Sequence, residues 1–146
     1  MPTVISVVTT AKIGIWNIPM RGQNFINNHY ADINNYKISY IAQQDFLFNN
    51  FNFLQSTVKK SDKKETIIIF CSTLQLLNLN RETRNFINFF KRYEINFSLE
   101  LKKGKGERYL NNIFKELNQF NNKQNISFKN VNTYKDLFKK YKNKIV

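Results

Sequence analysis

The sequence has little of several residue types, and each shortage excludes something. Cys71 is the only cysteine in 146 residues, so an internal disulfide cannot form. No Pro/Gly-rich linker divides the chain, and no apolar run approaches the roughly 20 residues that span a bilayer. A chain of this length can bury its own core, so we expect one α/β domain over residues 1–146. The start carries no signal-peptide pattern, and we expect a cytoplasmic protein.

Acidic residues are also scarce. The chain has ten Asp and Glu but 23 Lys and Arg, which gives a formal charge of +13 and a pI near 9.9. Such a balance indicates nucleic acid, an anionic membrane surface or a phosphorylated ligand as partner. However, only five of the basic residues are Arg, the residue that grips phosphate and bases best. Lys, Asn, Ile and Phe are the residues of A/T-rich codons, so part of the charge reflects base composition.

The basic excess lies mainly in the last third. Residues 1–100 hold 11 basic and 7 acidic residues, a net +4, whereas residues 101–146 hold 12 and 3, a net +9. Apolar residues recur there at helical spacing, which predicts a basic amphipathic helix over about 132–143. Two interpretations stay open: a helix that covers the core with its Lys in solvent, or one that docks on a membrane surface or partner.

Known catalytic and cofactor motifs are missing. The sequence has no P-loop, no GxGxxG after its first strand, no HExxH, no GxSxG and no paired Cys. His29 has no ligand-spaced partner, and Cys71 at a strand end is expected in the core. Nucleotide hydrolysis, dinucleotide redox and zinc chemistry are therefore disfavoured, and we expect no cofactor and no metal site.

Short apolar runs alternate with longer amphipathic stretches along the chain. Strands are predicted at 3–8, 12–18, 36–42, 66–71, 95–100 and 125–131, and helices at 22–34, 45–60, 81–93, 106–120 and 132–143. A strand period competes with the helical one over 46–54. This alternation is typical of βαβ units. It predicts one three-layer domain, flavodoxin-like or Rossmann-like, with a mainly parallel sheet of about five strands.

In such sheets ligands bind beyond the carboxyl ends of the strands. Polar residues follow four predicted strands, namely Arg21, Gln23 and Asn24; Gln43, Gln44 and Asp45; Ser72, Thr73, Gln75, Asn78, Arg81 and Arg84; and Glu100, Lys102, Lys103, Lys105 and Arg108. If all these strands are parallel, the four sets meet at one edge of the sheet. The sequence therefore predicts a polar cleft that contains Arg, amides and carboxylates.

Structural explanations compete with this site. Ser72 and Thr73 could only satisfy the last backbone groups of the strand, and Arg81 and Arg84 could pair with acidic residues at the surface. The glycines around Lys105 could form a simple turn or a phosphate cradle. These alternatives stay open at the level of sequence.

Three segments in order resemble the sporadic carbohydrate cluster proteins, small bacterial proteins of surface-polysaccharide gene clusters. They are "IPMRGQNFINNHYADINNYKISYIAQQDFLF", "IIIFCSTLQLLNLNRETRNF" and "INFSLE", within residues 12–105. The matching positions are Gln23, Asn24, Tyr30, Ser72, Leu74, Gln75, Leu76, Arg81, Arg84, Phe97, Leu99 and Glu100. The chain departs from the family pattern at Gln44-Asp45, Leu77 and Asn96. A weaker, fold-level similarity is to serine recombinase catalytic domains, but 17–24 lacks their serine nucleophile.

The resemblance implies a sugar, a sugar phosphate or a nucleotide sugar as ligand, in lipopolysaccharide or exopolysaccharide synthesis. We therefore expect an enzyme or binding component of surface-carbohydrate biosynthesis. Arg21, Arg81 and Arg84 would hold an anionic group, and Gln23, Asn24, Ser72, Thr73 and Gln75 would bind the remainder of the ligand. Glu100 or Asp45 would act as acid and base. The alternatives left open are a nucleic-acid binder that uses the basic last third, and a non-catalytic scaffold or homo-oligomer.

Overall fold

The computed structural model describes residues 2–14, 16–46, 50–61 and 65–122. The strand predicted at 125–131 and the helix predicted at 132–143 lie outside these described residues.

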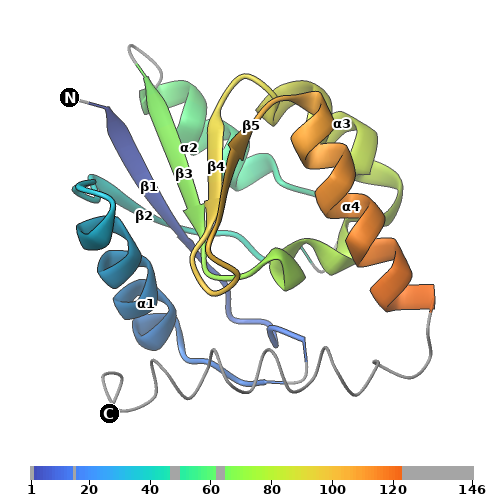
Figure 1. Ribbon diagram of the computed structural model, residues 1–146, viewed down its shortest axis with the longest axis horizontal. Helices are drawn as coiled ribbons and strands as arrows, with labels where there is room; N and C mark the ends of the chain where they lie inside the picture. Colours follow the sequence, from blue (N-terminus) through green and yellow to red (C-terminus); the bar gives the residue numbers. More distant parts are fainter. Residues whose placement is uncertain (1, 15, 47–49, 62–64, 123–146) are drawn as a thin grey trace.

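A five-stranded sheet forms the centre of the molecule (Figure 1). Its strands are β1 (Thr3–Val8), β2 (Tyr40–Gln43), β3 (Thr66–Phe70), β4 (Glu94–Phe97) and β5 (Lys102–Lys105), in the order β2-β1-β3-β4-β5. The first four strands are parallel, and β5 runs antiparallel to β4. The predicted mainly parallel α/β sheet is confirmed.

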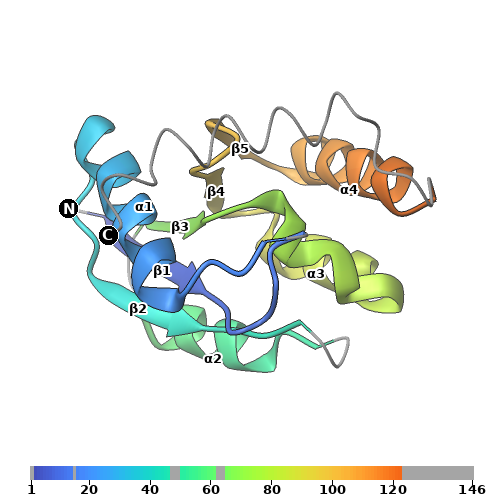
Figure 2. The same ribbon diagram turned by 90° about the horizontal axis from the view of Figure 1, so that it is seen from below.

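Helices cover both faces of this sheet. They are α1 (Met20–Ile33), α2 (Asn52–Ser61), a 3-10 helix η1 (Thr73–Glu82), α3 (Thr83–Phe90) and α4 (Glu107–Asn122). In both views α1 lies on one side of the sheet, whereas α3 and α4 lie on the other (Figures 1 and 2). The helices and the sheet thus form three layers.

The alternation of side chains along the central strands explains these layers. Ile67 and Ile69 of β3 point to α1, where Tyr30 and Ala31 meet them. Ile68 and Phe70, one residue along, point to the larger core on the opposite face. That core is rich in aromatic contacts, such as the Phe70–Phe97 stack at 5.4 Å between ring centroids. A strand buried on both faces reads as a continuous apolar run, which is why 66–70 stands out in the sequence.

Two predicted elements differ in the structure. The described residues of the range 12–18 are not a strand, and an isolated bridge joins Ile13 and Trp16 in the loop after β1. The reversal uses Gly14 at a φ of +64°, a conformation that suits glycine. The helix predicted over 45–60 begins only at Asn52, and Phe46 and Phe51 enter the core from the segment before it. Burial therefore explains Phe46 and Phe51, whereas Phe53 on α2 is 59 % exposed.

The largest correction concerns residues 98–108. The chain turns after β4, with Leu101 at a positive φ of 56°, and returns as β5, in which Lys105 pairs with Glu94. Lys105 and Arg108 therefore lie at the amino-terminal end of the parallel strands, opposite the edge predicted for them. β5 is an edge strand that solvent reaches, so its sequence "KKGK" has no apolar alternation. The sequence pattern therefore did not predict a strand here.

Candidate functional site

Two pairs of hydroxyl residues lie at the carboxyl ends of the central strands, and each pair holds a carboxylate. Thr9 and Thr10 follow β1 and bind Asp45, which comes from the segment after β2. Ser72 and Thr73 follow β3 and bind Glu100, which comes from the turn after β4. β1 and β3 are neighbours in the sheet, so both clusters lie at the same edge. Asp45 reaches this edge from β2 and Glu100 from β4, on opposite sides of the β1–β3 pair.

Glu100 is a carboxyl group held in a mostly buried place. Ser72 Oγ donates to Glu100 Oε2 at 2.9 Å, and the Thr73 backbone N–H donates to Glu100 Oε1 at 2.7 Å. Burial raises the pKa of Glu100 to about 7, although these two hydrogen bonds and the charge of Lys102 act in the opposite direction. At neutral pH the group is therefore divided between acid and conjugate base, the condition that suits a proton-transfer catalyst.

Asp45 has the opposite character. Its Oδ1 accepts from Thr9 Oγ1 at 2.6 Å and from the Thr10 N–H at 2.8 Å, and its Oδ2 accepts from Thr10 Oγ1 at 2.6 Å. Burial alone would raise the pKa of Asp45, but these hydrogen bonds outweigh it and lower the pKa below its usual value. The two carboxyl groups at this edge therefore have pKa values shifted in opposite directions, as expected of an acid and a permanent anion.

Two glutamine side chains hold the loops at this edge. Gln23 is fully buried; its Oε1 accepts from the Thr9 N–H at 2.8 Å, and its Nε2 donates to the carbonyls of Thr9 and Ile18. Gln75 accepts from the Ser72 N–H at 3.0 Å and donates to the Val7 carbonyl at 3.4 Å. Both were predicted to bind ligand, but their amide groups are engaged in fixing the ends of β1 and β3. Ser72 is buried as well.

A buried polar chain ties α1 to the sheet below this edge. Asn24 Oδ1 accepts from Ser6 Oγ at 2.9 Å, and Asn27 Nδ2 donates to the same hydroxyl. Ser98 Oγ donates to Asn27 Oδ1 at 2.7 Å, so the chain reaches from β1 to the turn after β4. Asn24 was predicted from the sequence, whereas Asn27 and Ser98 were not. Ser6, a polar residue inside the apolar run of β1, is the sequence feature that could have indicated this network.

The three candidate arginines do not form one cluster. Arg21 is exposed in the first turn of α1, next to the carboxyl edge. Arg81 is exposed near the end of η1, and a 3-10 helix rises roughly 2.0 Å per residue, so it lies up to about 16 Å from Thr73. Arg84 pairs with Glu107 at 3.1 Å, an ion pair open to solvent.

Sequence reasoning missed Thr9 and Thr10. It extended the strand region to residue 18 and so placed the first polar edge at 19–24. A Thr-Thr pair after the β-branched run of β1 was the available signal. Cys71 is fully buried, and burial raises the pKa of its thiol well above the ordinary value, so it is a core residue.

Within the described residues, no group of three or more His, Cys, Asp or Glu is arranged to hold a metal ion. Of the helices in the described ranges, none has the length and apolar character needed to cross a membrane. Comparisons with protein-family models, with curated proteins and with solved structures gave no match.

Proposed function

We propose that this chain acts in bacterial surface-carbohydrate biosynthesis on a sugar phosphate or nucleotide sugar, with Glu100 as the acid/base group. The observation that carries the proposal is the Glu100 carboxyl, held by Ser72 and Thr73 at the carboxyl edge with a pKa of about 7. The resemblance of three sequence segments supports the sugar class of the ligand.

The chemistry follows from the two carboxyl groups. At neutral pH Glu100 can give a proton to a leaving or carbonyl oxygen, or take one from a hydroxyl group. Ser72 and Thr73 fix the orientation of the carboxyl, and Lys102 contributes positive charge near it. Asp45, with its lowered pKa, stays ionised and holds the loop after β1 in place.

The anionic part of the ligand would bind Arg21, which is exposed in the first turn of α1, whereas Arg81 lies too far along η1 to join it. An Arg binds phosphate through two parallel hydrogen bonds, which is stronger and better oriented than a Lys contact. Gln23 and Gln75 would hold the loops of the site in place rather than bind the ligand, because their amides already bind backbone groups. Arg84 is paired with Glu107, so Arg84→Ala serves as the control for Arg21→Ala.

The test is a binding and turnover screen with sugar phosphates and nucleotide sugars, read by calorimetry and by NMR of the mixture. We expect Glu100→Gln to keep affinity within about twofold and to lower turnover by at least about 100-fold, the contribution typical of a general acid or base. Arg21→Ala should weaken binding by about tenfold or more, and Arg81→Ala and Arg84→Ala by less. Full turnover in Glu100→Gln would refute the role of Glu100.

A further inference from the structure

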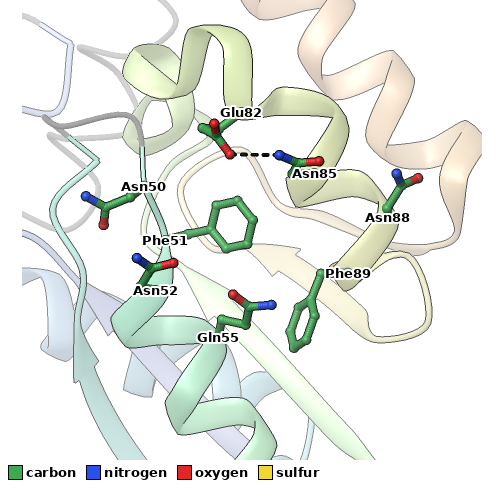
Figure 3. Close-up of a pocket in the computed structure, with 8 residues that line it drawn as sticks. All are labelled: Asn50, Phe51, Asn52, Gln55, Glu82, Asn85, Asn88 and Phe89. Atoms are coloured by element: carbon green, nitrogen blue, oxygen red, sulfur yellow. Dashed lines mark hydrogen bonds between the residues drawn. The ribbon is translucent and has the colours of Figure 1, made fainter.

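A groove of about 630 Å³ lies between the start of α2 and the helices η1 and α3 (Figure 3). One wall carries Asn52 and Gln55, and the other carries Glu82, Asn85 and Asn88. None of the residues that hold Asp45 or Glu100 lines it. The groove is therefore lined by other residues than the carboxylate clusters.

Side-chain amides dominate the chemistry of this groove. Asn50 adds a fifth amide to those of the two walls. Within the described ranges, the amide groups of Asn52, Gln55 and Asn88 make no hydrogen bond to another residue, so their donors and acceptors are available. Asn85 Nδ2 donates to Glu82 Oε2 at 2.9 Å, which fixes this carboxylate at the rim (Figure 3).

Two phenylalanines give the groove a firm apolar part. Phe51 packs edge-on against Phe86 and Phe90, with centroids 5.5 and 5.6 Å away. Phe89 also contacts Phe90, at 4.7 Å, and Lys59 Nζ lies 5.6 Å from its ring centroid. Phe51 is only 6 % exposed, so the apolar surface beside the amides comes mainly from the partly exposed Phe89.

We propose that this groove binds a neutral glycan. Each sugar hydroxyl both donates and accepts, as a side-chain amide does, and the C–H groups of a pyranose ring can pack on the exposed part of Phe89. The described lining contains Glu82 and no Lys or Arg, and the two cations beside it, Lys59 and Arg92, lie over the Phe89 ring, 5.6 Å from its centroid. The lining residues themselves therefore favour a neutral ligand.

The inference goes beyond the proposed function, because the groove would bind a glycan whether or not Glu100 transfers a proton. The two claims also differ in ligand. The carboxyl edge is proposed for a phosphorylated sugar, and the groove for an uncharged one.

The test is an NMR titration of the full chain with neutral hexasaccharides of glucose, mannose and galactose. We expect at least one of them to shift the amide signals of Gln55 and Asn88 with a Kd of about 10 mM or tighter. Gln55→Ala and Asn88→Ala, one from each wall, should weaken binding by about three- to tenfold each. Asn112→Ala is the matched control, since Asn112 is an exposed amide on α4, and it should change nothing.

Absence of shifts with all three sugars at about 10 mM would overturn the proposal. So would shifts caused equally by a neutral extended peptide, or an equal loss of affinity in Asn112→Ala. Glu100→Gln should bind the hexasaccharide as the natural chain does, so failure of the groove and failure of the acid/base role can be told apart.

Discussion

At the scale of single residues, the polar groups at the carboxyl edge divide into those that support and those that can react. Gln23 and Gln75 bind backbone groups, and Thr9 and Thr10 bind Asp45. Glu100 alone among them combines a fixed carboxyl with a pKa near neutrality. Sequence reasoning selected Glu100 and Ser72 but could not pair them, because their contact joins positions 28 residues apart.

Protonation of Glu100 should be visible in folding stability. Its pKa in the folded protein, about 7, lies above its ordinary value of 4.5, so the folded state holds the proton more tightly. Stability should therefore fall as pH rises from about 4.5 to 7, by on the order of 2 kcal/mol, and Glu100→Gln should remove this slope. Denaturant unfolding of both proteins between pH 5 and 8 measures it. Parallel curves would contradict the raised pKa.

Gln23 should matter for stability far more than its exposed neighbour. Gln23→Ala leaves the Thr9 N–H and the carbonyls of Thr9 and Ile18 without their buried partner. We expect a loss of about 2–4 kcal/mol in the free energy of unfolding. Arg21→Ala, two residues away and exposed, should cost under about 0.5 kcal/mol. Equal effects in urea unfolding would show that the Gln23 network is not a structural support.

At the scale of elements, the sequence predicted the buried strands and the long helices and missed the hairpin of β4 and β5. Two-sided burial marks β1 and β3 clearly, and the apolar stripe marks α4. Chain reversal at 98–101 depends on Leu101 in a left-handed conformation, which Leu rarely adopts and no composition signals. Edge strands such as β5 likewise lack an apolar pattern.

The hairpin offers a test of this packing through Gly104. A Cβ at that position would lie 2.4 Å from Tyr109 Cδ1, so the ring must move and lose the bond from its hydroxyl to the Ile95 carbonyl. Gly104→Ala should therefore destabilise the protein by about 1–3 kcal/mol. In a Tyr109→Ala background the same change should cost almost nothing, since the obstacle is absent. Additive costs in thermal unfolding would rule out this contact as the cause.

At the scale of the whole molecule, the alternation of strands and helices predicted the fold class. It did not predict the position of every candidate site residue. Four parallel strands do converge at one edge, but β5 carries Lys105 to the opposite end and η1 carries Arg81 away. Connections of this kind are decided by long-range packing. Residues adjoining the strands therefore lie at the carboxyl edge, where the sequence placed them, whereas Arg81 and Lys105, further along their loops, do not.

The overall charge should also influence stability. With 23 basic and 10 acidic residues, like charges repel within the folded chain. Exposed ion pairs such as Arg84–Glu107 contribute little stability against this repulsion. Raising the ionic strength screens this repulsion, since the Debye length shrinks from about 30 Å at 0.01 M to 10 Å at 0.1 M. We expect Tm to rise over this interval in sodium chloride. A fall in Tm would mean that ion pairs dominate.

The central claim is that Glu100 is a carboxyl poised for proton transfer at the carboxyl edge. Its most direct test is the titration of the Glu100 side-chain carboxyl carbon by ¹³C NMR, assigned with Glu100→Gln. The structure predicts a midpoint near pH 7, set by burial beside Ser72 and Thr73. A midpoint near 4.5, the ordinary value for glutamate, would contradict it.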